Sequence, residues 1–340
     1  MGRYNKMLAV VDTHTGGQPT RTIIGGMPRL KGNTMSEKML YMRDNLDHIR
    51  IMLTSEPRGN PATSATSVAV LTEPTDPTAD IGAFFCEYFG YMPMCGHDTI
   101  GVCTMLVENG MVNVTEPYTN IRMEVPAGII EARVCVEQGR AKSVSFKNAP
   151  SFVYGLDMDV EYEGKRVVFD VAYGGNFYAI IPANSLGIEL MPENYRLIVH
   201  TGLALIDIIN EKYEVMHPEK QFIRGVNHIQ FTNPIEQDGG GLKSKNCVVV
   251  RPGAVDRSPC GTGTSARVAD LYTRGVLELG QTLKHRSLID SLFEAKALES
   301  LDYFGYKAVI PEITGSAYIT GMSTVLLDPQ DEKGYGFTLM

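Results

Sequence analysis

A short motif occurs twice, about half a chain apart, and no other feature of the sequence restricts the fold so strongly. Cys95 and Cys260 each begin a Cys-Gly-x-x-Thr segment, and they lie 165 positions apart in a chain of 340 residues. A helical pattern follows each cysteine and stops fifteen residues later at a glycine, Gly110 or Gly275. Glycine readily adopts the left-handed conformation that ends helices. The repeat predicts two similar halves, each with one cysteine at a helix N-terminus.

Short runs rich in β-branched residues recur along the chain and indicate strands separated by Gly, Pro and Asn turns. Predicted strands include 8–11, 68–71, 144–146, 167–171, 178–181, 248–250 and 325–327. Helical patterns are fewer, at 36–50, 99–108, 193–210 and 264–274. The Gly-rich stretch 237–241 is predicted to be a flexible loop. Because strands and helices do not alternate regularly, we expect α+β architecture with curved or barrel-like sheets.

Length and the repeat together favour two domains, since 340 residues exceed what one small core needs. We place the first domain at 1–150, completed by a C-terminal strand at about 329–340, and the second at 151–328. With 39 acidic and 31 basic residues and no run of Lys or Arg, neither nucleic acid nor a membrane surface is an expected partner. No signal peptide or membrane span is recognised, so a cytoplasmic location is expected.

The cysteines other than the repeated pair lie in apolar runs. The chain shows no Cys-x-x-Cys spacing and no neighbouring His cluster, so we expect free thiols and no metal site. A free cysteine is most often a small buried hydrophobic residue. We assign that structural role to Cys86, Cys103, Cys135 and Cys247.

The N-terminus of a helix is suited both to binding a carboxylate and to activating a thiol. Its unpaired backbone N–H groups carry partial positive charge, which attracts anions and lowers the pKa of a nearby thiol. We expect both helices to point into one cleft between the domains, with the α-carbon of a substrate between the two sulfurs. The N–H groups expected to hold the substrate carboxylate are those near Gly96, His97, Gly261 and Thr262.

Cys95 and Cys260 are therefore predicted to act as an acid and base pair. Inverting a carbon requires a base on one face and an acid on the other, and the reverse reaction exchanges their roles. Thiols with a pKa near neutrality would supply both thiolate and thiol. His97 and Asp256 stand close to the two cysteines in sequence, and we predict that they bind the substrate ammonium and tune the thiols.

The sequence resembles the proline racemase family over nearly its whole length. That family includes proline racemases, hydroxyproline 2-epimerases and trans-3-hydroxyproline dehydratases. The resemblance implies a diaminopimelate-epimerase-like fold, in which two pseudo-symmetric domains of barrel-like mixed sheet each surround a central helix. It also implies no pyridoxal phosphate, no metal and a homodimer. The segments that carry it are 12–17, 56–59, 94–97, 173–177, 256–265 and 314–321.

Within the resemblance, the second cysteine separates the reaction types. The dehydratases are similar at Cys95 but usually have Thr at the position of Cys260, so both thiols favour proton transfer at one carbon over elimination. Proline racemases usually have Phe where Ser64 and Val250 align here, and the smaller residues favour 4-hydroxyproline as the substrate. Proline racemisation is the alternative. Dehydration of trans-3-hydroxy-L-proline by Cys95 alone, and imino-acid binding without catalysis, are the remaining hypotheses.

Overall fold

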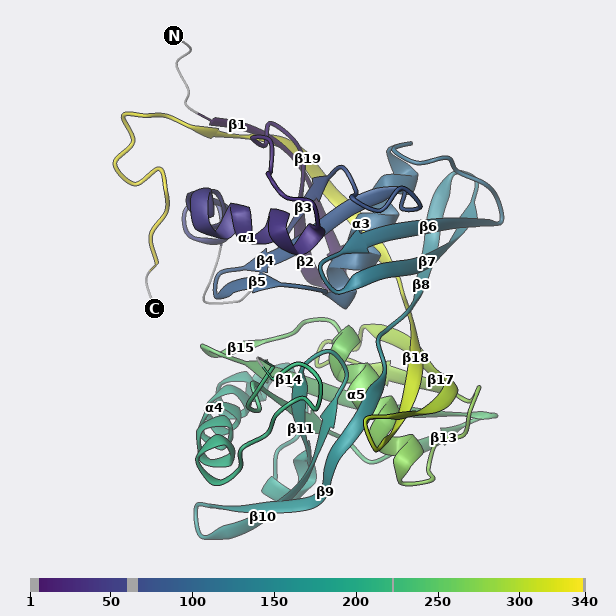
Figure 1. Cartoon of the computed structure of the whole chain (residues 1–340). Helices are drawn as coiled ribbons and strands as arrows, with labels where there is room; N and C mark the ends of the chain where they lie inside the picture. Colours follow the sequence, from purple (N-terminus) through teal and green to yellow (C-terminus); the bar gives the residue numbers. More distant parts are fainter. Residues whose placement is uncertain (1–5, 60–66, 222, 339–340) are drawn as a thin grey trace. The chain divides into compact units, whose positions relative to one another are not determined.

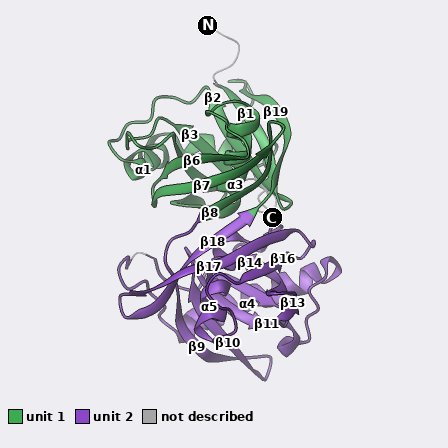
Figure 2. Ribbon diagram, turned by 90° about the vertical axis from the view of Figure 1, so that its right-hand side faces the viewer, with its two compact units in different colours: residues 1–146, 315–340 green, residues 147–314 purple. Residues whose placement is uncertain are grey.

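The chain forms two compact units that each contain one of the repeated cysteines. The computed structural model describes residues 6–59, 67–221 and 223–338. Unit 1 comprises Met1–Phe146 together with Gly315–Met340, and unit 2 comprises Lys147–Thr314 (Figure 2). The chain therefore leaves unit 1 near residue 147 and returns near residue 315, where the sequence placed the boundaries at 151 and about 329.

Unit 1 is built on eight strands in the order β19, β1, β2, β3, β4, β6, β7 and β8. Neighbours are antiparallel except β2 with β3 and β4 with β6, which are parallel. A short strand, β5, pairs with β4. The bounds are β1 (Lys6–Thr15), β2 (Gln18–Gly25), β3 (Ser67–Thr72), β4 (Ile81–Glu87), β5 (Gly90–Met92), β6 (Tyr118–Val125), β7 (Gly128–Glu137), β8 (Arg140–Lys147) and β19 (Ala317–Leu327).

Unit 2 has the corresponding order β9, β10, β11, β12, β14, β16, β17 and β18, and β18 pairs with β9 to close the sheet into a barrel. Two pairs are again parallel, β11 with β12 and β14 with β16. The bounds are β9 (Ser151–Tyr162), β10 (Lys165–Tyr173), β11 (Phe177–Pro182), β12 (His228–Thr232), β13 (Glu236–Asp238), β14 (Gly241–Val250), β15 (Ala254–Val255), β16 (Thr282–Arg286), β17 (Leu292–Tyr303) and β18 (Tyr306–Gly315).

The two units follow the same plan, strand for strand. In each, the two parallel pairs occur at the same places in the order, and one helix separates the strands of the second parallel pair. The turn between β1 and β2 contains Gly16 and Gly17, and the turn between β10 and β11 contains Gly174 and Gly175. Three of these glycines have positive φ, which a residue with a Cβ seldom adopts. The α+β class and the epimerase-like architecture predicted from the sequence are confirmed.

Two buried helices carry the repeated cysteines, and the other helices cover the sheets (Figure 1). Every residue of α3 (Gly96–Glu108) except the last is buried, as are most residues of α5 (Gly261–Thr273). α4 (Tyr195–Lys212) buries one face because Ile198, Leu205 and Ile209 recur at helical spacing. α1 (Met35–Asn45) and α2 (Asp47–Thr54) replace the single helix predicted at 36–50, and η2 (Ala183–Leu186) and η3 (Pro192–Asn194) are 3-10 turns.

The helices α3 and α5 end as the sequence predicts. Each is followed by a glycine in the left-handed region, Gly110 with φ 64° and Gly275 with φ 71°. The next residue then donates its N–H to a carbonyl five residues earlier, which is the Schellman arrangement. These hydrogen bonds join Met111 to Leu106 and Val276 to Leu271, both at 2.8 Å.

Two expectations about local structure are wrong. The strand that returns to unit 1 is β19, and the described residues after Leu327 form turns and one isolated β-bridge, between Phe337 and Glu56, instead of the strand expected at about 329–340. The β-branched run ends at Leu327, and Asp328 and Asp331 then accept turn hydrogen bonds. The stretch 237–241 is no long loop, because β13 and β14 pair up to Asp238 and Gly241 and leave only a tight hairpin turn.

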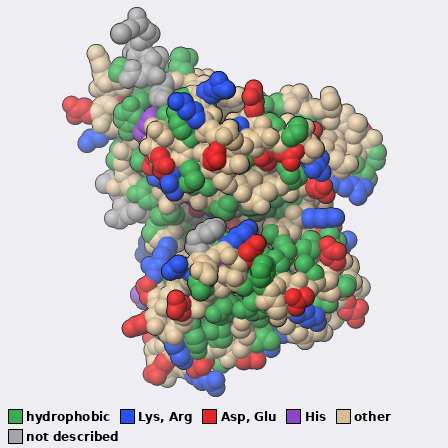
Figure 3. Space-filling model, viewed as in Figure 1, with side chains coloured by type: hydrophobic (Ala, Val, Ile, Leu, Met, Phe, Trp, Pro, Cys, Tyr) green, Lys and Arg blue, Asp and Glu red, His purple; other side chains and the backbone are tan. Residues whose placement is uncertain are grey.

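The described helices and the charged side chains of one face bear on possible partners. No helix within the described ranges is long and apolar enough to cross a membrane. On the face shown in Figure 3, basic and acidic side chains are interspersed. This mixture agrees with the formal net charge of −8.

Candidate active site

Cys95 is the residue immediately before α3, as the sequence predicts. It is the N-cap, with φ −143° and ψ 126°, and its carbonyl accepts hydrogen bonds from the N–H of Thr99 at 3.1 Å and its hydroxyl at 2.7 Å. The threonine of the repeated motif therefore fixes the first turn of the helix. Because the first N–H groups of a helix have no intrahelical partner, those of Gly96 and His97 are suited to a carboxylate.

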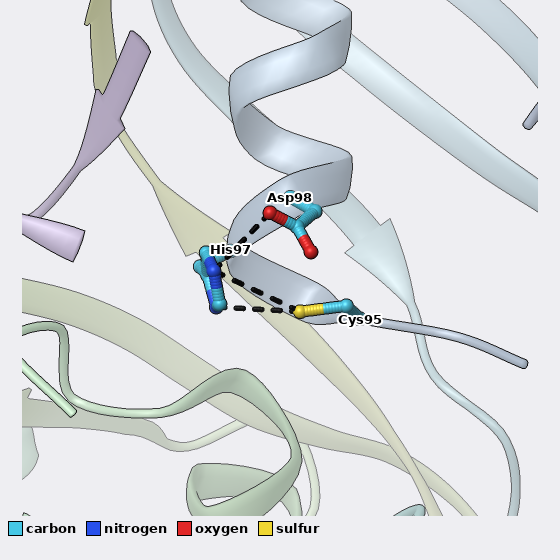
Figure 4. Close-up of side chains that lie close together, drawn as sticks. All are labelled: Cys95, His97 and Asp98. Carbon is cyan, nitrogen blue, oxygen red and sulfur yellow. Dashed lines mark hydrogen bonds and ion pairs between the residues drawn. The ribbon is translucent and has the colours of Figure 1, made fainter. Parts of the chain in front are cut away.

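Cys95, His97 and Asp98 form a hydrogen-bonded row at the start of α3 (Figure 4). The Cys95 sulfur lies 3.3 Å from Nδ1 of His97, and Nε2 of the same ring lies 3.2 Å from Oδ1 of Asp98. All three residues are buried. One imidazole thus has a thiol on one nitrogen and a carboxylate on the other, which allows it to exchange a proton with the sulfur while Asp98 balances its charge.

Two hydroxyls from neighbouring strands hold Asp98. Thr20 on β2 donates to Oδ1 and Ser67 on β3 donates to Oδ2, each at 2.6 Å. Asp98 has no exposed surface, and its burial alone would raise its pKa. His97 and the two hydroxyls outweigh burial and lower the pKa, so Asp98 is ionised.

Burial and charge act on the two other members of this row in different ways. Burial raises the pKa of the Cys95 thiol, with a further contribution from Asp98, while His97 opposes the shift. Burial would lower the pKa of His97, but the charges of Asp98 and Cys95 raise it well above its ordinary value. The imidazolium form of His97 is therefore the one that faces the sulfur.

Cys260 is the N-cap of α5, and its backbone is strained. Its φ is 66° with ψ 109°, a conformation rarely adopted by residues other than glycine and one that is concentrated at functional sites. Its sulfur accepts from the N–H of Gly263 at 3.4 Å. The loop before it is fixed by Asp256, which accepts from the N–H and hydroxyl of Ser258, and the Ser258 hydroxyl accepts from the N–H of Cys260.

A tyrosine from β11 completes the surroundings of Cys260. The hydroxyl of Tyr178 lies 3.4 Å from the Cys260 sulfur and 2.5 Å from the hydroxyl of Thr262. Tyr178 is fully buried, and burial raises its pKa well above the ordinary value, so its hydroxyl is neutral. Thr262, predicted as a ligand for the substrate carboxylate, therefore also binds this hydroxyl with its side chain.

From the helix N-termini we expected thiol pKa values near neutrality. The surroundings of both sulfurs raise these pKa values instead. The pKa of Cys260 is raised to about 12, because burial and the charge of Asp256 raise it by more than Tyr178, Gly263 and Thr262 lower it. Desolvation of a buried sulfur thus outweighs the partial charge of the helix end. Each thiol must therefore depend on its own hydrogen-bond partners, or on a charged ligand, to lose its proton.

Cys95, His97 and Asp98 also form the one group of three His, Cys or carboxylate side chains, within the described ranges, whose ligating atoms lie within 4.8 Å of one another. Both carboxylate oxygens of Asp98 already accept hydrogen bonds from hydroxyls, and His97 is paired on both nitrogens. The group is satisfied by these bonds, and we interpret it as a proton relay. That the protein needs no metal remains a prediction.

Of the remaining predicted site residues, the structure describes Val250 and Gly261 but not Ser64. Ser64 lies outside the described residues. Val250, at the end of β14, stands opposite His228 on β12, and His228 stands opposite Tyr178 on β11. Paired residues on adjacent strands share a face, so Val250 lies on the same face as the tyrosine that contacts Cys260. Gly261 follows Cys260 in the first turn of α5 and keeps an N–H without an intrahelical partner.

Sequence reasoning missed most of the side chains that surround Cys95 and Cys260 in the structure. Except for Asp98, which lies inside the repeated motif, these residues are far from their cysteine in the chain and carry no motif of their own. One signal was present: the Gly-Gly turn occurs twice, and the third residue after each copy is part of the site. The missed residues are Thr20, Ser67, Asp98, Tyr178 and His228.

The other four cysteines have a structural setting. Cys86, Cys103 and Cys247 are buried, Cys135 is partly buried, and all six cysteines of the chain are free thiols. Burial raises the pKa of Cys86, Cys103 and Cys247, with no hydrogen-bonded imidazole or tyrosine beside them. The repeated pair differs from them in having His97 or Tyr178 within hydrogen-bond distance of the sulfur, and its catalytic role stays a prediction.

Comparison with known proteins shows likeness over the whole chain. The profile of the proline racemase family matches residues 10–338. A 4-hydroxyproline 2-epimerase of Streptosporangium roseum is 45% identical over 338 residues, covering 99% of this chain and 100% of that protein. A proline racemase of Acetoanaerobium sticklandii is 41% identical over 339 residues, with the same coverage.

A solved structure shows the same fold. It is a hydroxyproline epimerase from Agrobacterium vitis with bound trans-4-hydroxy-L-proline. Its TM-score with this chain is 0.90 at 35% identity, and the match covers 100% of this chain and 96% of that one.

Proposed function

Since the chain belongs to the proline racemase family, we propose that it inverts the α-carbon of a proline-type imino acid by moving protons between substrate and the thiols of Cys95 and Cys260. One observation carries this proposal. Each cysteine caps a matching buried helix, and each sulfur has a titratable side chain within hydrogen-bond distance, His97 at 3.3 Å and Tyr178 at 3.4 Å. None of the four other cysteines has such a partner among the described residues.

In the first half of the reaction, Cys95 removes the α-proton as a thiolate. The His97 imidazolium, balanced by Asp98, stabilises the negative sulfur before the transfer. Cys260 then delivers its thiol proton to the opposite face of the carbon. The reverse reaction starts with Cys260 as the thiolate, so each turnover leaves the proton on the other cysteine.

The substrate contributes to its own activation. The ring nitrogen of a proline-type imino acid is cationic, and a positive charge near a buried thiolate lowers the pKa that burial has raised. The carboxylate accepts hydrogen bonds from the first N–H groups of the helices, at Gly96 and His97 and at Gly261 and Thr262. These donors also stabilise negative charge that develops at the carboxylate as the α-proton leaves.

We propose two roles for Asp256: it binds the substrate ammonium, and it fixes the loop before Cys260. Its Oδ1 accepts two hydrogen bonds from Ser258, which fixes the approach to Cys260. Its negative charge raises the pKa of the Cys260 thiol, and a substrate cation next to Asp256 would cancel that effect. Binding of the substrate and ionisation of Cys260 are thereby linked.

4-Hydroxyproline is the substrate that we favour. Val250 leaves room where an aromatic side chain would fill the face that it shares with His228 and Tyr178. Nδ1 of His228 is buried and has no hydrogen-bond partner within the described residues. A ring hydroxyl would satisfy this nitrogen, whereas the unsubstituted ring of proline would leave it unpaired. Proline racemisation is the alternative.

Exchange of the α-proton in deuterium oxide, followed by NMR, tests the reaction and the substrate together. We expect trans-4-hydroxy-L-proline to gain deuterium at the α-carbon and to convert to cis-4-hydroxy-D-proline, faster than L-proline reacts. With trans-3-hydroxy-L-proline we expect exchange or no reaction, and formation of a ring imine would instead identify a dehydratase. Absence of exchange with all three imino acids would contradict an isomerase function on these compounds.

A substitution at Val250 separates the two isomerase substrates. Val250→Phe fills the space assigned to the ring hydroxyl, so it should reduce turnover of 4-hydroxyproline relative to proline. Val276→Phe, at an exposed position after α5, is the matched control and should leave the ratio unchanged. Equal effects of both variants on the ratio would remove the support that Val250 gives to 4-hydroxyproline.

A further inference from the structure

We propose that Tyr178 is a positioning residue that stabilises the thiolate of Cys260, the part that His97 and Asp98 play beside Cys95. This inference rests on the proposed function, because only a cysteine that exchanges a proton needs such support. Tyr178 reaches the site from β11, far from Cys260 in the chain. Its hydroxyl contacts the sulfur at 3.4 Å and the Thr262 hydroxyl at 2.5 Å, and no other titratable side chain within the described residues hydrogen-bonds to this sulfur.

The repeat of the fold shows which residue of unit 1 corresponds to Tyr178. Tyr178 is the third residue after the Gly-Gly turn that leads into β11, and Thr20 is the third residue after the Gly-Gly turn that leads into β2. Each stands opposite a polar residue on the adjacent parallel strand, His228 for Tyr178 and Ser67 for Thr20. Both positions therefore present a hydroxyl towards the first turn of the buried helix.

The two units differ at one helix position, and that difference explains how far each hydroxyl reaches. The third residue after the cysteine is Asp98 in α3 and Gly263 in α5. Thr20 donates to the Asp98 carboxylate. A Cβ added at Gly263 would lie 3.2 Å from both the Cys260 sulfur and Cε1 of Tyr178. The glycine thus leaves the space through which the longer tyrosine approaches the sulfur directly.

A neutral hydroxyl can serve both protonation states of Cys260 by turning. When Cys260 is a thiolate, Tyr178 donates its proton to the sulfur and accepts from Thr262. When Cys260 is a thiol, the sulfur donates to the Tyr178 oxygen and Tyr178 donates to Thr262. The hydrogen bond count is unchanged, and Tyr178 stays neutral because burial disfavours its ionised form.

The other titratable groups around Cys260 do not replace this contact. Asp256, in the preceding loop, is bonded to Ser258 and disfavours the thiolate by its charge. His228 on β12 packs against the Tyr178 ring, with centroids 4.7 Å apart, and burial lowers its pKa to about 4. His285 on β16 lies 2.9 Å from the Thr264 hydroxyl, and burial lowers its pKa to about 3. Both histidines are neutral near pH 7.

Site-resolved alkylation tests the proposal without requiring turnover. The full-length protein is treated with iodoacetamide at pH 8, where only thiolates react appreciably, and mass spectrometry measures the rates at Cys260 and Cys95 in the same molecules. Tyr178→Phe removes the hydroxyl and keeps the ring. We expect the Cys260-to-Cys95 rate ratio to fall about tenfold, because loss of one hydrogen bond to a charged sulfur corresponds to roughly one pKa unit.

Two variants act as controls. Tyr173→Phe removes a hydroxyl from a ring that packs on Phe152 and His217, and it should leave the ratio unchanged. His97→Asn removes the partner of Cys95 and should change the ratio in the opposite direction. If Tyr178→Phe fails to fold by circular dichroism, Thr262→Val replaces it, since it removes the other hydrogen bond of the same hydroxyl and should also lower the ratio.

An unchanged ratio in folded Tyr178→Phe, equal slowing of both cysteines, or no reaction at Cys260 in the unmodified protein would overturn the proposal. The outcome is independent of isomerase activity. A tenfold fall in the ratio together with no α-proton exchange would contradict the proposed function and leave the assignment of Tyr178 in place. Exchange of the α-proton together with an unchanged Cys260-to-Cys95 rate ratio would support the proposed function and contradict the assignment of Tyr178.

Discussion

The start of α3 and the start of α5 share a backbone plan and differ in the charge that surrounds the sulfur. Both helices are thirteen residues long, both follow a cysteine N-cap, and both end at a left-handed glycine. Beside Cys95 the partners are an imidazolium and a carboxylate. Beside Cys260 they are a neutral tyrosine and a threonine. The repeated fold therefore places both thiols at a helix N-terminus, but the backbone of Cys260 has a positive φ and that of Cys95 is extended, and their neighbouring side chains differ.

Under the proposed function, a reaction that treats both faces of the carbon alike takes place between two thiols with different surroundings. A racemase or epimerase needs one thiolate and one thiol at the start of each turnover. His97 can carry a positive charge and so favours the thiolate at Cys95, whereas Tyr178 is neutral and supports Cys260 in either state. Each of the following experiments tests a part of this comparison.

Substitution of either repeated cysteine should have the largest effect. Cys95→Ser and Cys260→Ser each remove one member of the acid and base pair, and a serine hydroxyl is far less acidic than a thiol. We expect each to reduce isomerisation by about 10²- to 10⁴-fold, the usual contribution of such a group. Initial rates with the substrate identified by α-proton exchange measure the loss.

Cys135→Ser, at a partly buried cysteine on β7, is the control and should retain the activity of the unmodified protein. If only Cys95→Ser loses activity, the two sites are not a pair, and chemistry at one face of the carbon would explain the result.

Asp98→Asn should disrupt the hydrogen-bonded row of Cys95, His97 and Asp98 and have the next largest effect on activity. The variant keeps the shape of the side chain but removes the negative charge that raises the pKa of His97. The His97 pKa should fall, less imidazolium should face Cys95, and activity should drop at least about tenfold, in line with one pKa unit. NMR titration of the His97 ring measures the pKa directly. A His97 pKa equal in both proteins would show that Asp98 does not set its charge.

The pH dependence of stability should differ between the helices. In α5 burial raises the pKa of Asp270 to about 7, above its value in the unfolded chain. Its folded-state proton therefore stabilises the protein at low pH, and this contribution is lost as pH rises from about 4 through 7. Asp98 in α3 has a lowered pKa, so its contribution is lost instead as pH falls below its unfolded value.

Asp270→Asn keeps a neutral side chain at all pH values and should flatten the decline of thermal stability between about pH 4 and 7. Melting temperatures across that range, for both proteins, provide the measurement. An identical slope in the variant would show that Asp270 is ionised in the folded protein throughout.

The helix ends should give the smallest effect, and an equal one in both units. Nothing lies within 4 Å of a Cβ added at Gly110 or Gly275, so alanine at either position adds only backbone strain. Left-handed backbone costs an L-residue about 1 kcal/mol or slightly more. Gly110→Ala and Gly275→Ala should each lower the free energy of unfolding by about that amount in denaturant titrations. Clearly unequal losses would mean that the two helices contribute differently to the stability of their units.

The sequence alone predicted the features that depend on residues close together in the chain. The Cys-Gly-x-x-Thr repeat located the starts of α3 and α5, and the following glycines located their ends, because capping is decided within one turn of a helix. Hydrophobic and β-branched runs located the strands at 8–11, 167–171 and 248–250, since the period of a strand is local too. His97 was found because it lies two residues from its cysteine.

Only the tertiary structure decided what supports each thiol. Thr20 and Ser67 meet Asp98, and Tyr178 meets Cys260, because strands β2, β3 and β11 bring residues far apart in the chain to the first turn of a buried helix. The register of paired strands sets these contacts, and no local pattern records it. Burial likewise reversed the expected shift of the thiol pKa, because desolvation depends on every atom that surrounds the sulfur and not on the helix that the sulfur caps.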